Sequence, residues 1–154
     1  MSDWLTPALI CLGFPLVWIG ILRFASAVSG WRALAAQYPA REPFSGPIRR
    51  FEHIRLGWSN YQNCVNVGAS GEGLYLTLWF LFRPFHPPLF IPWSELSAKV
   101  ARGWLVNRLE LRFNLCPGII LLVSEQLGRQ IAADANRAWS VVETYGEPSE
   151  PSAS

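Results

Sequence analysis

The chain reads LYLTLWFLF at residues 74–82, and this alternation indicates the class of the domain. Every even-numbered position in the segment is leucine or phenylalanine, and the odd-numbered positions are tyrosine, threonine, tryptophan and leucine. Successive side chains of an extended strand point to opposite faces of the sheet. Both faces of this strand are therefore apolar or aromatic. We predict a strand that is central in its sheet or covered on both sides.

Other segments share the same period of two. Residues 109–113, LELRF, alternate so that Glu110 and Arg112 face water while the other three face a core. Further strands are predicted at residues 51–56, 63–68, 89–93, 99–105 and 119–123. Turn-forming sequences such as SGEG and CPG separate these segments. Seven short strands at this spacing predict an antiparallel sandwich or barrel.

The period becomes helical after the last predicted strand. Ser124 is a suitable N-cap, and the apolar residues that follow recur at spacings of three and four. These residues are Leu127, Ile131, Ala135, Ala138, Trp139 and Val142. We predict one amphipathic helix that closes the domain. The tail at 143–154 is acidic and rich in proline and serine, so we expect it to be disordered.

The N-terminal segment has a different character. Residues 5–22, LTPALICLGFPLVWIGIL, carry no charge and would cover about 27 Å as a helix, close to the roughly 30 Å hydrocarbon core of a bilayer. Trp4, Trp18 and Phe24 are placed to lie near the interfaces. Pro15 falls in the middle of the run and should kink the helix. The segment predicts a single membrane-spanning helix.

Two other interpretations of this segment are weaker. Ala25-Ser26-Ala27 resembles the cleavage site of a signal peptide, but the residues before the apolar run include Asp3 and no lysine or arginine. A buried core helix would need a larger domain to hide a helix that is apolar on all sides.

Charges on the two sides of the run predict its orientation. No lysine or arginine precedes it, whereas six arginines lie between Arg23 and Arg55. Basic residues are retained on the cytoplasmic side of a membrane. We therefore expect an inner-membrane, single-pass protein with its N-terminus outside and its C-terminal domain in the cytoplasm. Residues 29–38, SGWRALAAQY, predict a short helix capped by Ser29 and lying along the membrane surface.

The predicted organisation has four parts. Residues 1–28 are the transmembrane anchor, 29–46 a juxtamembrane helix and basic linker, 47–142 the β domain with its C-terminal helix, and 143–154 the tail. Charged residues are only 16% of the chain, against roughly 25% in typical soluble domains, as a membrane anchor requires. A net charge of +2 with a single lysine excludes a dedicated nucleic-acid binder.

Chemistry-bearing side chains are few. The three cysteines form an odd set without a C-x-x-C motif, so we expect them to be reduced. Only His53 and His86 could activate Cys64 or Cys116, and no residues show metal-ligand spacing. His86 lies between prolines and is interpreted as a turn-capping residue. We predict no catalytic residue, no metal and no cofactor, and hence no enzyme.

Aromatic residues are more numerous than a small core can bury, and exposed apolar patches mark membrane or protein contacts. The residues predicted to bind a partner are Trp79, Phe85, Phe90 and Trp93. The favoured hypothesis is a non-catalytic accessory module that docks on a partner membrane protein or complex at the cytoplasmic face.

The alternative hypothesis is a peripheral module that senses anionic lipids. Basic groups close to an anionic leaflet each gain up to about 1 kcal/mol. The residues predicted to contact lipid headgroups are Arg41, Arg49, Arg50 and Arg55. The positive-inside rule alone would also explain these arginines.

Two segments, GLYL at 73–76 and PLFIPWSEL at 88–96, carry a family resemblance. They are similar to a recurring pattern in small membrane-attached bacterial proteins with a pleckstrin-homology-like domain, most of them uncharacterised. The resemblance covers residues 47–142 and implies two packed antiparallel sheets plugged at one end by a helix. It implies no catalytic residues. The chain lacks the lysine-rich loop between the first two strands of lipid-binding pleckstrin-homology domains, so phosphoinositide binding is not implied.

Overall fold

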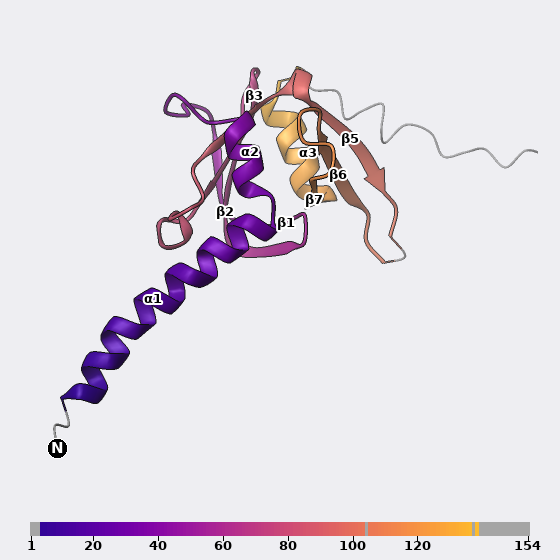
Figure 1. Ribbon diagram of the computed structural model, residues 1–154. Helices are drawn as coiled ribbons and strands as arrows, with labels where there is room; N and C mark the ends of the chain where they lie inside the picture. Colours follow the sequence, from indigo (N-terminus) through magenta and orange to yellow (C-terminus); the bar gives the residue numbers. More distant parts are fainter. Residues whose placement is uncertain (1–3, 104, 137, 139–154) are drawn as a thin grey trace, which may run out of the picture.

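A computed structural model describes residues 4–103, 105–136 and 138. An N-terminal helix is followed by a short helix, seven strands and a final helix (Figure 1). The helices are α1 (Leu5–Val28), α2 (Trp31–Gln37) and α3 (Glu125–Asp134). The strands are β1 (Ile48–Leu56), β2 (Ser59–Ala69), β3 (Gly73–Leu78), β4 (Leu89–Pro92), β5 (Leu96–Ala101), β6 (Arg108–Phe113) and β7 (Ile120–Ser124). Two single 3₁₀ turns, η1 (Phe80–Phe82) and η2 (Trp93–Glu95), flank β4.

Helix α1 projects away from the rest of the molecule (Figure 1). It is the helix among the described residues that is long and apolar enough to cross a membrane, and only 6% of its most apolar window is buried. The low burial distinguishes α1 from the core helix of a soluble protein. Pro15 lies inside the helix, which continues to Val28.

The seven strands form one antiparallel sheet with the order β4-β3-β2-β1-β7-β6-β5. The sheet curls into a half-barrel because β1 pairs with β7 and joins the two halves, with Ile54 opposite Val123. A bulge at Phe51, whose φ is +61°, breaks the β1–β2 register and helps to bend the sheet. The predicted layout of an N-terminal apolar helix, a seven-strand antiparallel domain and a closing helix is confirmed.

Helix α3 packs on the concave side of the sheet. Ser124 caps it by accepting a hydrogen bond from the Leu127 amide at 3.2 Å, as predicted. Leu127 and Ile131 are buried in the same core as Leu109 and Val123. The predicted apolar positions Trp139 and Val142, and the tail at 143–154, lie outside the described residues.

The short helix predicted at 29–38 packs its apolar face against the β domain. We expected it along the membrane surface, but Trp31 and Leu34 of α2 are fully buried in the core of the domain. A half-barrel has open edges and ends, and the apolar face of α2 covers part of this opening rather than a lipid surface. Gly30, with φ of +81°, makes the turn from α1, where a Cβ would collide with Ile119.

The strand predicted over 74–82 is shorter than expected. All six residues of β3 are buried, which confirms a covered strand, and the ring of Phe44 stacks on Tyr75 at 4.8 Å to cover its outer face. The chain leaves the sheet at Trp79 and forms η1, because Phe82 finds an apolar partner in α1: the Trp18 and Phe82 ring centroids are 5.5 Å apart. Residues 79–88 are thus a loop between β3 and β4.

Candidate functional site

The β3–β4 loop is bonded to the end of α1, and this contact fixes the helix against the domain. Ser26 Oγ, fully buried in the last turns of α1, donates a hydrogen bond of 2.7 Å to the Phe85 carbonyl oxygen. The indole Nε1 of Trp31 donates to the Pro87 carbonyl oxygen at 2.8 Å. We call this junction of α1, α2 and the loop the seam.

A buried polar cluster lies inside the seam. The Tyr61 hydroxyl oxygen lies 2.8 Å from Ser29 Oγ and 3.1 Å from His86 Nε2, and His86 Nδ1 lies 3.1 Å from the Pro84 carbonyl oxygen. A carbonyl oxygen can only accept, so neutral His86 donates from Nδ1 and offers Nε2 as an acceptor. His86 therefore caps its own turn, as predicted, and also contacts β2 through Tyr61.

The environment of the cluster keeps it uncharged. Burial lowers the pKa of His86 below its ordinary value of 6.5, against the opposing effect of the hydrogen bonds to the Pro84 and Phe82 carbonyls. Burial also raises the pKa of Tyr61. His86 and Ser29 are at most 1% exposed, so a substrate in solution has no access to them.

Sequence patterns did not reveal the seam. Ser26 and Phe85 are 59 residues apart, and Tyr61 and His86 are 25 apart. Serine and tyrosine are common residues, and no spacing marks them as partners. The one available signal was Ser26 itself, a small polar residue in a mostly apolar helix.

Two of the predicted partner-binding residues lie in the β3–β4 loop. Trp79 is 37% exposed and Phe85 is 38% exposed, and between them Phe80 and Leu81 are also exposed. The guanidinium carbon of Arg23, on α1, lies 5.6 Å from the centre of the Phe85 ring. The loop and α1 together form one continuous apolar and aromatic surface.

Trp93 lies apart from this surface, in the core. It is 9% exposed, and its indole Nε1 donates to the Ser70 carbonyl oxygen at 2.8 Å. The loop that carries Trp93 is thereby fastened to the β2–β3 turn. Because the side chain is buried in the folded domain, we assign it to stability and leave it out of the docking surface.

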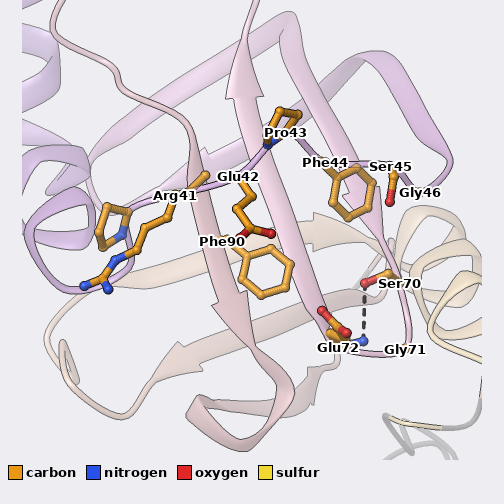
Figure 2. Close-up of a pocket in the computed structure, with 12 residues that line it drawn as sticks. Arg41, Glu42, Pro43, Phe44, Ser45, Gly46, Ser70, Gly71, Glu72 and Phe90 are labelled. Carbon is orange, nitrogen blue, oxygen red and sulfur yellow. Dashed lines mark hydrogen bonds between the residues drawn. The ribbon is translucent and has the colours of Figure 1, made fainter.

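The fourth predicted partner-binding residue, Phe90, lines a cleft of about 620 Å³. The cleft lies between the linker at 39–46 and the β2–β3 turn at 70–72 (Figure 2). Glu42 and Phe90 project into it, with Glu72 at its lower rim, whereas the guanidinium of Arg41 points away (Figure 2). The interior of the cleft is therefore both aromatic and acidic.

The walls of this cleft are held in place by backbone contacts. The Phe90 amide donates to the Tyr38 carbonyl oxygen at 3.0 Å, and the Ala40 amide donates to the Pro88 carbonyl oxygen at 3.1 Å. The linker thereby covers the outer edge of β4. A side chain at Gly68 would collide with the ring of Phe44, so that ring is seated tightly on the sheet.

The four arginines predicted to bind lipid do not form one cluster. Arg41 borders the cleft, while Arg50 and Arg55 line two separate grooves on either side of β1. Arg49 forms an ion pair with Asp134 of α3, with Nη2 3.1 Å from Oδ2. Of these four, Arg50 lines a groove with the exposed Trp79 and Phe80 and with Arg83.

The cysteine thiols are poorly suited to nucleophilic chemistry. All three cysteines are free, and burial raises the pKa of the Cys64 and Cys116 thiols, which disfavours the reactive thiolate. Within the described ranges, no group of three or more His, Cys, Asp or Glu residues could hold a metal ion.

No family model, curated protein or solved structure matches the chain.

Proposed function

We propose that the chain is a non-catalytic, single-pass membrane module that holds its β domain in one orientation and offers the cleft at Phe90 to a partner membrane protein. Arg23, near the end of α1, and Arg32 and Arg41 after it support an inner-membrane location with a cytoplasmic domain. The order of seven strands and one closing helix supports a domain of the pleckstrin-homology-like type.

The observation that carries this proposal is the seam. A domain that only needed to stay near a membrane could hang from a flexible tether. Here α1 leads into α2 through a turn of two residues, and Ser26 and Trp31 are both bonded to the β3–β4 loop. Because the helix and the domain are fixed together, the membrane sets the direction in which the cleft faces. A rigid connection between the helix and the domain suits a docking or accessory subunit.

The chemistry of the cleft defines its occupant. Phe44 and Phe90 offer apolar contact, and the carboxylates of Glu42 and Glu72 add negative charge. A peptide segment that carries an aromatic or aliphatic side chain next to a lysine or arginine complements this arrangement. The same two carboxylates would repel anionic lipid headgroups. The segment belongs, in our proposal, to the cytoplasmic part of a membrane protein.

A non-catalytic role is supported by the burial of a cluster that resembles a catalytic arrangement. The Tyr61 hydroxyl is within hydrogen-bond distance of both Ser29 and His86, but each of the three residues is buried and none of them lines the clefts described above. A hydroxyl and an imidazole that no substrate can reach serve to join elements of the fold.

The lipid-sensing alternative rests on a different observation. Arg50 and Arg83 share a groove with Trp79 and Phe80, a combination suited to an anionic membrane interface. The proposal for Arg41, Arg49 and Arg55 is weaker, because Arg49 is paired with Asp134 and the others lie elsewhere. We therefore favour docking over headgroup sensing.

Site-specific photo-crosslinking in intact cells tests the docking proposal. Benzoylphenylalanine would replace Phe90 in the full chain, with Gln126 on the exposed side of α3 as the control position. We expect a discrete adduct with a membrane protein from position 90 and none from position 126. The adduct should weaken several-fold in the Glu42→Gln, Glu72→Gln double variant and persist in Glu52→Gln. Equal labelling at both positions, or an adduct insensitive to Glu42 and Glu72, would overturn the proposal.

The orientation needs its own test. A reporter fused after Ser154 should be active only as a cytoplasmic reporter. Activity of a periplasmic reporter at the same position, or a mature protein that begins after residue 27, would refute the proposed topology.

A further inference from the structure

We propose that the β3–β4 loop at residues 79–85 is a second membrane contact, inserted into the leaflet on the domain's side of the bilayer beside α1. The proposal rests on the proposed crossing of the membrane by α1. It assigns the exposed aromatics of the loop to lipid and leaves the cleft at Phe90 free for a protein partner.

The depth of the loop follows from its contacts with α1. Trp18 Nε1 lies 3.5 Å from the Leu81 carbonyl oxygen, and the Trp18 and Phe82 ring centroids are 5.5 Å apart. Trp18 precedes Arg23 by five residues, which is about 7.5 Å along a helix axis. The tip of the loop therefore lies about 7.5 Å further along the apolar run than the first arginine.

The membrane register of α1 has little freedom. The uncharged run at 5–22 covers about 27 Å and the hydrocarbon core is roughly 30 Å thick, so nearly all of the run is needed to cross it. Arg23 must then lie at the membrane–water boundary, and Trp18 must lie inside it. Leu81 and Phe82, which contact Trp18, are at that same depth.

The other end of the loop lies at the level of the headgroups. Phe85 is bonded to Ser26, which is eight residues or about 12 Å along the helix from Trp18. From Leu81 and Phe82, at the depth of Trp18, the loop thus rises to Phe85 on the water side of Arg23. The guanidinium of Arg23, which we place at the membrane–water boundary, lies over the Phe85 ring.

The composition of the loop suits this position. Phe80 is 66% exposed and Leu81 is 44% exposed, whereas their neighbour Phe82 packs against the core of the domain. No acidic residue occurs between Gly73 and Ser94. Arg83 lines a groove with Arg50, where both can reach anionic headgroups. Aromatic side chains with basic neighbours are typical of segments that lie in a membrane interface.

A lipid occupant is preferred over a protein because the exposed surface of the loop is continuous with that of α1. The exposed side chains of the helix, among them Phe14 and Val17, would meet acyl chains on all sides in a bilayer. The exposed surface of the loop lies at the same depth beside α1, so it would also meet acyl chains. A protein partner would have to displace lipid from both α1 and the loop.

The test uses the full chain with its three cysteines replaced by alanine, reconstituted in vesicles of zwitterionic and anionic phospholipids. A spin label is attached at Phe80→Cys in the loop, at Leu12→Cys in α1 as the lipid control, and at Ser97→Cys in β5 as the water control. Collision with oxygen, which concentrates in the bilayer, is compared with collision with a water-soluble nickel chelate. Thermal unfolding of each variant checks that the domain is folded, and Leu81→Cys replaces Phe80→Cys if that variant does not fold.

The proposal predicts that the label at position 80 favours oxygen over the chelate several-fold more than the label at position 97 does, and less than the label at position 12, which lies deeper in the bilayer. A label at 80 that behaves like 97 while 12 reports lipid would overturn the loop insertion and leave the anchor intact. A label at 80 shielded from both reagents would show a protein contact and overturn the lipid assignment. Water-like behaviour at both 80 and 12 would overturn the anchor, and the insertion with it.

Discussion

Ser26 Oγ on α1 donates a hydrogen bond of 2.7 Å to the Phe85 carbonyl oxygen, and this bond connects the apolar helix to a loop 59 residues later in the chain. The bond is short and the serine is fully buried. A polar side chain this far along an apolar helix is thus explained by the domain that it contacts. It also explains why residues 79–88 form a loop against α1 rather than a longer strand.

Replacing Ser26 by alanine should destabilise the domain. The Phe85 carbonyl oxygen would lose its partner in a buried place, which costs about 1–3 kcal/mol. Urea unfolding of the detergent-solubilised full chain, followed by circular dichroism, measures the free energy of unfolding. Ser97→Ala on the exposed side of β5 is the control. A Ser26→Ala variant as stable as that control would show that the seam adds nothing to stability.

The stability of the domain should depend on pH through His86. Burial holds the pKa of His86 below its ordinary value of 6.5, so the unfolded chain takes up a proton at a higher pH than the folded chain does. The free energy of unfolding should therefore fall as the pH decreases below about 6.5, down to the lowered pKa of the folded state.

The His86→Gln variant tests this dependence. It removes the titrating group, so the fall in stability between neutral and mildly acidic pH should become smaller, whatever the stability of the variant at neutral pH. Gln126→Ala, on the exposed side of α3, removes no titrating group and is the control, which should keep the wild-type profile. Parallel profiles for wild type and His86→Gln would contradict the prediction.

Helix α3 should be required for folding. Leu127 is 2% exposed and Ile131 is 1% exposed, both within the main core. Truncation of either to alanine should cost about 2–5 kcal/mol through lost burial and a residual cavity. Gln126→Ala on the outer side of α3 should have little effect. If thermal unfolding of all three variants coincided, α3 would not belong to the core.

Trp79 and Trp93 should respond differently to truncation. Trp93→Ala removes a buried ring and its hydrogen bond to the Ser70 carbonyl oxygen, so a loss of about 3–5 kcal/mol is expected. Trp79→Ala should cost clearly less, because more than a third of that residue is exposed. Equilibrium unfolding of the two variants decides the matter. Equal losses would place Trp79 in the core as well.

The alternation of apolar and polar residues predicted the sheet well. The LELRF pattern at 109–113 places β6 to within one residue, because one face of this strand is buried and the other faces solvent. The pattern failed at residues 79–82, where both faces are apolar. Periodicity carries no information about where such a run leaves the sheet. The partner that ends the strand, Trp18, is distant in sequence.

The same limit applies to the candidate site. Trp79, Phe85, Phe90 and Trp93 were grouped by residue type, and the fold separates them into a loop beside α1, a cleft and the core. An exposed tryptophan and a buried one have the same letter in a sequence. Arg49 likewise gave no sign of its ion pair with Asp134, which lies 85 residues later.

We propose above all that the β domain is fixed relative to α1. Pulsed electron–electron spin resonance on the full chain in lipid nanodiscs measures this directly, with labels at Leu12→Cys in α1 and Ser97→Cys in β5 and the native cysteines replaced. The account predicts a single narrow distance distribution that broadens when Ser26 is replaced by alanine. A broad distribution in the chain that retains Ser26, as a domain on a flexible tether would give, would contradict it.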